Sequence, residues 1–390
     1  MPTPTAQRQI GIHDPWITDL EKKEVSEALA SNWLSGGGSK VHAFEDLAQE
    51  FFQSTERPIS TANGSAALLL GLRVAGVQAG DHVLVPSYGF VACANAVRHL
   101  GAEPIFIGPE NPEMPVVTFE QIKSFFEKEI GPDFRLRKTG ARIQGMIYNQ
   151  PYGLTCPRLS AIAEFFQERK LFLFEDSSQG MGVRLGNSLL GTFGDLSIFS
   201  LNGNKTITTG AGGLLLIKNP AWAARARKLL AQSRCDDFDF YYGEAAYNFQ
   251  MPNVSAAIGV GQFKRIAEIL EKKSNIRTHY RTLLRSWKLF AAEMTYPAWH
   301  NLALARRAAS RAEMRALASA TQARGVRIRP AFPAVTENAM YKNSLSYQNE
   351  KSPFLFDHGI CLPSGPALEK EDIEYVCAVL EEEGRRLDLI

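Results

Sequence analysis

The chain has 390 residues, of which 45% are hydrophobic and 22% are charged, and its formal net charge is +2. A balance this close to neutral gives no reason to expect nucleic-acid binding, and no apolar run reaches the roughly 18–20 residues of a membrane span. The length allows one large domain and a smaller one.

The cysteines and histidines indicate neither a disulfide framework nor a metal site. The five cysteines are far apart and lack C-x-x-C spacing, and the seven histidines lack H-x-x-x-H spacing. We therefore expect free thiols in a reducing compartment and no metal. Because the first residues also lack an apolar leader segment, we predict a cytoplasmic protein that does not bind a membrane.

Helical periodicity predicts two helices near the start of the chain, over residues 17–31 and 40–53. Thr18 or Asp19 can cap the first of them. The glycine-rich turn between the helices carries Trp33, which either packs against the core or forms the wall of a pocket.

From residue 65 to residue 217 the chain alternates between apolar runs and amphipathic segments. The apolar runs predict strands over 82–86, 104–107, 143–148, 171–174, 196–199 and 213–217. The amphipathic segments predict helices over 65–75, 92–100, 118–129 and 158–169. Because the strands are continuously apolar, we predict an α/β fold with a mostly parallel, doubly wound sheet that helices cover on both faces.

Further helices are predicted over 220–234 and 253–287, the second leading into a smaller C-terminal α+β domain. That domain has a helix over 311–324, an extended segment over 327–332 and a final helix over 370–386. We place the large domain at 1–255 and the small domain at 256–390. The helix over 17–31 is a candidate to pack on the small domain.

Polar residues follow several of the predicted strands, where doubly wound sheets bind their ligands. Asp176 ends the stretch L-F-L-F-E-D, and it either caps the next turn or faces a cation such as a protonated pyridine nitrogen. Lys205 lies in S-L-N-G-N-K-T-I-T-T-G-A-G-G, between two apolar runs. Loop composition alone favours a solvated lysine, and the alternative is a Schiff-base lysine with a depressed pKa.

Three further segments carry weaker signals. The stretch A-N-G-S-A-A-L opens a helix, and it is either an ordinary cap or a site for a phosphate. Tyr88 and Phe90 follow a strand, and each either packs in the core or stacks on a planar ring. The turn Y-N-F-Q-M-P-N precedes a helix of small residues, which is typical of a subunit interface.

The order and spacing of these segments resemble the DegT/DnrJ/EryC1/StrS family of pyridoxal 5'-phosphate (PLP) dependent sugar aminotransferases, over nearly the whole chain. The stretch G-T-F-G-D-L-S-I-F-S-L-N-G-N-K-T-I-T-T-G-A-G-G is similar to G-x-F-G-D-x-x-x-F-S-F-x-x-x-K-x-I-T-T-G-E-G-G. V-P-S-Y-G-F-V-A-C-A-N-A-V resembles P-x-x-T-F-x-A-T-x-N-A, and E-D-S-S-Q resembles E-D-A-A-Q. Y-N-F-Q-M-P-N-V-S-A-A-I-G is similar to Y-N-x-R-M-x-N-x-Q-A-A-I-G. The resemblance implies a fold type I PLP-dependent transferase.

The resemblance also implies roles for individual residues. Lys205 matches the Schiff-base lysine and general base, Asp176 the partner of the pyridine nitrogen, and Gln179 a polar neighbour of the ring. Phe90 matches the aromatic that stacks on the ring, with Tyr88 as a competitor. The implied phosphate contacts are Gly64, Ser65, Ala66 and Ser200, joined by Asn248 of a second subunit, so that a homodimer shares its active sites. The candidate substrate contacts are Trp33, Ser35, Tyr88 and Arg329.

The implied reaction moves an amino group from an amino acid, L-glutamate, to a keto-sugar, most simply a nucleotide-linked 4- or 3-keto-deoxysugar. The chain departs from the family pattern at Gly89, at Ala211 and in the segment R-P-A-F-P-A-V-T that begins at Arg329. Since that segment shapes the acceptor pocket, a keto-cyclitol or another non-nucleotide acceptor stays open. A PLP-dependent sugar dehydratase or deoxygenase and a non-catalytic PLP-binding homologue are the alternatives. Lys205 disfavours the first, and Lys205, Asp176 and Gln179 together disfavour the second.

Overall fold

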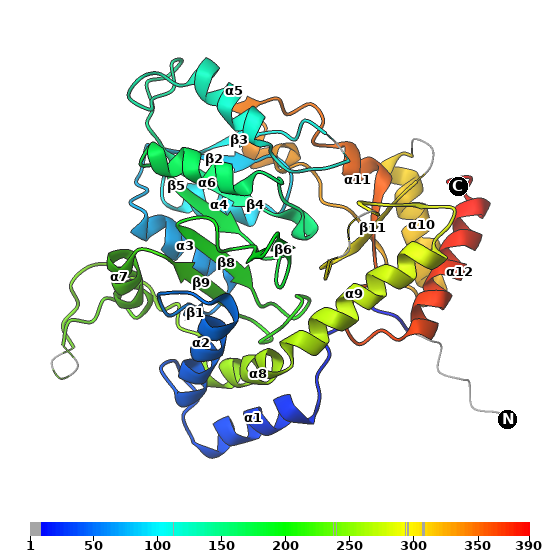
Figure 1. Cartoon of the computed structure of the whole chain (residues 1–390), viewed down its shortest axis with the longest axis horizontal. Coiled ribbons are helices and arrows are strands. Elements are labelled where there is room, and N and C mark those ends of the chain that lie inside the picture. Colours follow the sequence, from blue (N-terminus) through cyan, green and yellow to red (C-terminus); the bar gives the residue numbers. More distant parts are fainter. Residues whose placement is uncertain are drawn as a thin grey trace.

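The computed structural model describes residues 9–111, 113–236, 238, 240–292, 294, 296–305 and 309–390. A larger lobe is built around one sheet and a smaller lobe around a second sheet, as Figure 1 shows. Within these ranges no helix combines the length and the apolar character that crossing a membrane requires.

The large sheet has the strand order β1-β9-β8-β5-β4-β2-β3-β13. Its strands are β1 (Ile59–Thr61), β2 (His82–Pro86), β3 (Glu103–Ile107), β4 (Ile143–Asn149), β5 (Phe172–Asp176), β8 (Leu196–Ser200), β9 (Gly213–Ile217) and β13 (Ser346–Tyr347). Six neighbouring strands, in the order β8-β5-β4-β2-β3-β13, run parallel to one another. Strand β9 is antiparallel to β8, and β1 is antiparallel to β9. All six predicted strands occur, and the predicted α/β fold with a mostly parallel sheet is confirmed.

Helices cover both faces of this sheet. They are α2 (Ser39–Phe52), α3 (Gly64–Val74), α4 (Ala92–His99), α5 (Phe119–Glu129), α6 (Leu159–Glu168), α7 (Pro220–Leu230) and α8 (Asn253–Lys264), and a further helix, α1 (Asp19–Ala30), packs on α8. In β5, Leu173 packs into the core cluster under α5 and α6, whereas Phe172 and Phe174 pack into the opposite cluster under α3, α4 and α7. Because successive strand residues point to opposite faces, a sheet covered on both sides needs continuously apolar strands.

The predicted single helix over 253–287 is wrong, because the structure divides it into α8 and α9 (Ile266–Leu283). The break lies at Arg265, whose backbone has φ −113° and ψ 13°. The Arg265 guanidinium lies 3.2 Å from a carboxylate oxygen of Glu21 and 4.0 Å from the ring centre of Trp16. These contacts hold the break against the N-terminal segment, and α9 runs on from it to the small lobe (Figure 1).

The small lobe combines α9 with an antiparallel sheet of order β10-β11-β14-β12. Its elements are β10 (Lys288–Leu289), β11 (Asn301–Leu304), α10 (Arg311–Ala323), β12 (Arg329–Pro330), α11 (Phe354–His358), β14 (Gly359–Leu362) and α12 (Lys370–Arg386). The remaining elements are the hairpin of β6 (Arg184–Leu185) and β7 (Ser188–Leu189), and single 3-10 turns at Pro151–Gly153, Val335–Glu337 and Ala339–Tyr341.

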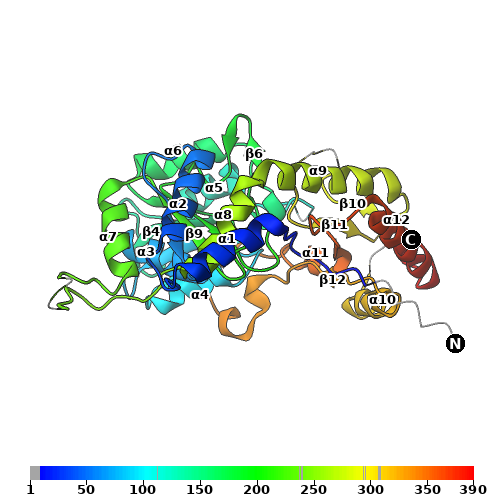
Figure 2. The ribbon, with the colours of Figure 1, turned by 90° about the horizontal axis from the view of Figure 1, so that it is seen from below.

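Segments from both ends of the chain cross between the lobes. Ile10 forms a bridge with Val326 of the small lobe, and β13 adds a parallel strand to the edge of the large sheet next to β3. The N-terminal helix α1 begins after Thr18, which caps it, and lies along α8 in Figures 1 and 2. The expected domain boundary at 255/256 falls inside α8, whose Val260 packs in the same cluster as Phe199 of β8.

Candidate active site

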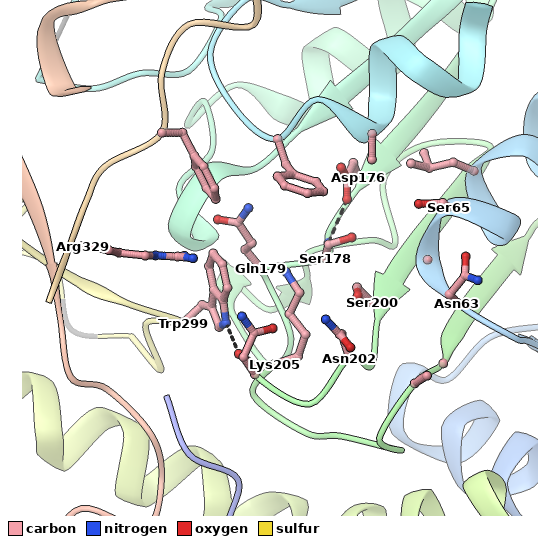
Figure 3. A pocket seen from close by; sticks show the side chains of 18 residues that line it. Asn63, Ser65, Asp176, Ser178, Gln179, Ser200, Asn202, Lys205, Trp299 and Arg329 are labelled. Carbon is pink, nitrogen blue, oxygen red and sulfur yellow. Dashed lines mark hydrogen bonds between the residues drawn. The ribbon is translucent and has the colours of Figure 1, made fainter. Parts of the chain in front are cut away.

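A cavity of about 310 Å³ opens where β5 and β8 of the large sheet end (Figure 3). Parallel strands of such sheets carry their ligand sites at these ends. Eight of the predicted site residues line the cavity: Gly64, Ser65, Phe90, Asp176, Gln179, Ser200, Lys205 and Arg329. The structure therefore brings together residues that lie up to 265 positions apart in the printed chain.

Backbone hydrogen bonds shape the loop that carries Lys205. The N–H of Leu201 donates to the carbonyl of Gly212 at 2.9 Å, and the N–H of Thr209 donates to the carbonyl of Leu201 at 3.0 Å. Lys205 itself closes a turn by donating its N–H to the carbonyl of Asn202 at 3.0 Å. Since the strands on either side pair with each other, this loop is anchored at both ends.

The amine of Lys205 lies in a setting unlike that of a solvated loop lysine. Its Nζ is 4.0 Å from the ring centre of Trp299. The pKa of Lys205 is lowered to about 8, mainly because burial disfavours the charged amine. The charge of Arg329 also lowers this pKa, whereas the charge of Asp176 raises it. A lysine in water titrates near 10.4, so this amine is neutral far more often at physiological pH.

Asp176 and Glu175 both end β5 but have different partners. Asp176 lines the cavity, and its Oδ1 accepts the N–H of Ser178 at 3.1 Å while its Oδ2 accepts from Sγ of Cys93 at 2.9 Å. Glu175 is fully buried and accepts backbone N–H groups within the segment 191–194. Asp176 thus caps the following turn and also presents its charge to the cavity, so both interpretations of this residue describe its geometry.

The start of α3 forms the opposite end of the cavity. The Oδ1 atom of Asn63 caps this helix by accepting the N–H of Ala66 at 2.8 Å. The N–H groups of Gly64 and Ser65 belong to the first turn, where a helix offers no carbonyl partner. A Cβ atom at position 64 would come within 3.2 Å of the Cβ of Ser200, so glycine lets the helix start approach the end of β8.

An aromatic wall from the small lobe closes the cavity beside Lys205. The rings of Trp299 and Phe332 stack with their centroids 6.2 Å apart, and Trp299 Nε1 donates to the carbonyl of Asn204 at 2.7 Å. The guanidinium carbon of Arg329 lies 5.3 Å from the Trp299 ring centre (Figure 3). Its Nη2 is buried without a hydrogen-bond partner, and no carboxylate of the described ranges forms an ion pair with it. This cation is therefore available to an anionic ligand group.

Phe90 and Tyr88 lie on different sides of the cavity wall. Phe90 is 56% exposed and lines the cavity, next to Phe332. Tyr88 is 1% exposed, does not line the cavity, and places its hydroxyl 3.2 Å from that of Tyr152. Of the two candidates for stacking on a ligand ring, only Phe90 is in a position to do so in this structure.

The other predicted site residues lie outside the cavity. Ala66 faces a neighbouring hollow between α3 and α4. Trp33 and Ser35 are exposed on the turn between α1 and α2, and Trp33 Nε1 donates to a carbonyl of that same turn. Asn248 is exposed and lines a separate hollow beside Arg227. Within one chain, these four residues do not meet Lys205.

A family model described as the DegT/DnrJ/EryC1/StrS aminotransferase family matches residues 15–381. The chain belongs to this family. The aminotransferase character and the PLP dependence expected from the sequence are thereby confirmed.

Known proteins resemble this aminotransferase along most of its length. GDP-perosamine synthase of Escherichia coli O157:H7 is 30% identical over 381 residues, which are 96% of this chain and 98% of that protein. A dTDP-4-dehydro-2,3,6-trideoxy-D-glucose 4-aminotransferase of Saccharopolyspora spinosa is 29% identical over 288 residues, which are 70% of this chain and 71% of that protein. The crystal structure of the aminotransferase TlmJ from Streptoalloteichus hindustanus superposes with a TM-score of 0.84, at 26% identity, over 97% of this chain and 100% of that one.

The residues of the aminotransferase cavity fit PLP. Lys205 offers an amine of lowered pKa that has no ion-pair partner among the described residues. Asp176 offers a carboxylate for a protonated ring nitrogen. The start of α3 offers N–H groups and the positive end of a helix dipole to a phosphate, and glycine at position 64 brings this helix start close to Ser200.

Sequence reasoning missed several residues that line the cavity. Asn202 and Asn204 belong to the lysine loop, and their closeness to Lys205 in the chain was a usable signal. Trp299 and Phe332 come from the small lobe. Nothing in the local sequence distinguishes Trp299 from an ordinary core aromatic, because only the docking of the two lobes brings it to Lys205. Phe332 lies in the segment after Arg329 that was expected to shape the acceptor pocket, and this was a usable signal.

Proposed function

We propose that this aminotransferase moves an amino group from L-glutamate to a nucleotide-linked keto-sugar. The observation that carries the proposal is the partly buried side chain of Lys205, whose amine has a pKa lowered to about 8 and shares one cavity with Asp176. The name of the E. coli relative specifies a nucleotide-linked amino sugar as its product, and that relative matches 96% of this chain. The name of the S. spinosa relative specifies a 4-keto-sugar nucleotide as its substrate.

In the proposed mechanism the cavity residues hold PLP and set its charge. Bound PLP supplies an electron sink for the electron pair of a breaking Cα–H bond. Asp176 holds a proton at the ring nitrogen, and the turn N–H of Ser178 keeps this carboxylate in place. The start of α3 and Ser200 would hold the phosphate, and Phe90 and Gln179, which line the same cavity, would contact the ring.

In this proposal Lys205 accepts the proton from the breaking Cα–H bond and later returns it. With a pKa of about 8, its amine can both accept and return a proton near neutral pH. The ring of Trp299 stabilises the charged form of the amine and keeps water from that side. The presence of a lysine at this position supports amino transfer over sugar deoxygenation, because a lysine amine can both accept and return the proton that amino transfer moves.

We assign Arg329 to an anionic oxygen of the substrate. Its Nη2 atom is buried and lacks a hydrogen-bond partner, which costs free energy unless a ligand satisfies it. The aromatic rings of Trp299 and Phe332, at 5.3 and 5.5 Å from its guanidinium carbon, hold the side chain at the cavity wall. A carboxylate of the amino donor and a phosphate of the acceptor offer the same chemistry to it.

We also propose a homodimer in which Asn248 of each subunit reaches the phosphate end of the other subunit's cavity. Asn248 is exposed and lies outside the cavity of its own chain, which supports a role in a second copy.

We also propose that the protein is cytoplasmic. Its five cysteines form no disulfide, which supports a reducing compartment.

A half-reaction experiment tests the proposed function. The PLP-loaded protein is treated with L-glutamate until its absorbance changes to that of the amine-loaded cofactor, and 2-oxoglutarate is measured. A panel of keto-sugar nucleotides and keto-cyclitols is then added, and we expect a keto-sugar nucleotide to restore the original absorbance and to yield an amino sugar. Recovery with a keto-cyclitol alone would show that the acceptor class is wrong. A deoxygenated product without a new amine would show that the reaction type is wrong.

A further inference from the structure

The thiol of Cys93 lies directly against the carboxylate that faces the cavity. Its Sγ is 2.9 Å from Oδ2 of Asp176, although the two residues are 83 positions apart. Cys93 is the second residue of α4 and is 1% exposed. It does not line the cavity, so it can influence a bound molecule only through a residue that does.

The proton in this contact belongs to sulfur. Burial raises the pKa of the Cys93 thiol well above its usual value, and the neighbouring charge of Asp176 raises it further. An ionised carboxylate can only accept hydrogen bonds, so the S–H group donates to Oδ2. The other oxygen, Oδ1, accepts the N–H of Ser178 at 3.1 Å. One donor from α4 and one from the turn after β5 therefore fix the orientation of the carboxylate.

A thiol orients a carboxylate with a weaker hydrogen bond than a hydroxyl does. Hydrogen bonds to a carboxylate stabilise its charged form and make it a weaker base. The S–H group is a weak donor, so it orients Asp176 and leaves most of the negative charge of the carboxylate to interact with the ring nitrogen. The sequence segment around Cys93 resembles a pattern with threonine at this position, so this chain has a thiol where the pattern has a hydroxyl.

We propose that Cys93 is a positioning residue for the aminotransferase, which orients the carboxylate of Asp176 toward the ring nitrogen of PLP. The inference rests on the proposed role of Asp176 as the partner of that nitrogen. It assigns a function to a residue that contacts neither the cofactor nor the substrate.

A double-mutant cycle on PLP binding tests the proposal. The dissociation constant of PLP is measured by absorbance titration of the apo-protein for the wild type, Cys93→Ala, Asp176→Asn and the double variant. We expect Cys93→Ala to weaken PLP binding on the order of three- to tenfold, the range of one lost hydrogen bond. In the Asp176→Asn background the same substitution should change the constant by less than about twofold, because the charge through which Cys93 acts is gone.

Cys93→Ser supplies a second, nearly isosteric variant with a spectroscopic readout. A hydroxyl is the stronger donor, so it competes more strongly for the negative charge of Asp176 and weakens the hold of the carboxylate on the ring-nitrogen proton. The nitrogen that links Lys205 to the cofactor then loses its proton at a higher pH. The pH midpoint of the absorbance titration therefore shifts upward. Cys377→Ala is the matched control, since Cys377 is a buried cysteine of α12 in the core of the small lobe, and it should leave both measurements unchanged.

The outcomes separate this inference from the function on which it rests. Equal weakening by Cys93→Ala in both backgrounds, with an unshifted titration in Cys93→Ser, would reduce Cys93 to a packing residue and overturn the proposal. If Asp176→Asn alone leaves PLP binding and the titration as in the wild type, the proposed role of Asp176 fails, and the role of Cys93 fails with it.

Discussion

The chemistry of single residues centres on Lys205, the lysine in the cavity of this aminotransferase. Lys205→Ala is expected to abolish the absorbance of the lysine-linked cofactor and the transfer of the amino group, because no other lysine lines the described cavity. Absorbance spectra and turnover measure both effects. Lys22→Ala is the control, since Lys22 is exposed on α1 and forms only a surface ion pair with Asp19. An undiminished lysine-linked band in Lys205→Ala would remove this residue from the mechanism.

The lowered pKa of Lys205 predicts a pH profile for cofactor loading. Only the neutral amine attacks an aldehyde, and it becomes abundant as the pH rises through the pKa of about 8. The rate at which apo-protein takes up PLP should therefore increase with pH around a midpoint near 8. Stopped-flow absorbance at a series of pH values measures the midpoint.

Asp176→Asn provides the matched variant for this profile. The charge of Asp176 raises the pKa of Lys205, so its removal should move the midpoint to lower pH. A midpoint near that of a free lysine, or no shift in the variant, would contradict the electrostatic description of the cavity.

At the scale of an element, the start of α3 combines a structural task with a binding task. Asn63 caps the helix through its Oδ1 atom and also lines the cavity. Asn63→Ala should lower the stability of the apo-protein by about 1 kcal/mol, the usual cost of a lost helix cap. Thermal or denaturant unfolding of the apo-protein measures this loss.

Asn63→Asp separates the two tasks. Aspartate caps helices about as well as asparagine, so the stability of the apo-protein should stay near that of the wild type. Its negative charge repels the phosphate of PLP, and the dissociation constant should rise by at least about tenfold. Unchanged PLP binding in Asn63→Asp would place the phosphate away from this helix.

At the scale of the whole molecule, the proposed shared active site predicts complementation between two inactive variants. Lys205→Ala and Asn248→Ala are unfolded together, mixed and refolded. A mixed dimer has one complete site, formed by Lys205 of one subunit and Asn248 of the other. Random pairing makes half of the dimers mixed, so about a quarter of the wild-type activity should return. If Asn248 serves the cavity of its own chain, the mixture stays inactive.

Both lobes are needed to complete the cavity. The large lobe supplies Lys205 and Asp176, whereas the small lobe supplies Trp299 and Arg329. The buried amine of Lys273 ties this arrangement together, because it donates to the carbonyl of Trp299 at 2.8 Å and lies 2.9 Å from Nε2 of His13 on the N-terminal segment. The position of the aromatic wall thus depends on the docking of the lobes rather than on any one element.

The sequence by itself determined six of the eight strands of the large sheet and the places of Lys205 and Asp176 at the ends of two of them. Apolar runs of four to six residues between polar turns are a local signal. A strand that is covered on both faces is apolar at every position, so the whole run can be recognised in the sequence. The same runs predict where the ligand site lies, because parallel strands present their ends on one edge of the sheet.

Only the tertiary structure decided the rest. In the small sheet only β12 falls in a predicted extended segment, over 327–332, whereas β10, β11 and β14 escaped prediction because strands of two to four residues are too short to show a period. The break at Arg265 depends on Glu21, far away in the chain. Trp299 beside Lys205 and Cys93 beneath Asp176 are contacts between segments that meet only after the lobes and layers have packed. Local pattern specifies which element a residue belongs to, whereas the neighbours that set its pKa and its orientation come from elsewhere in the fold.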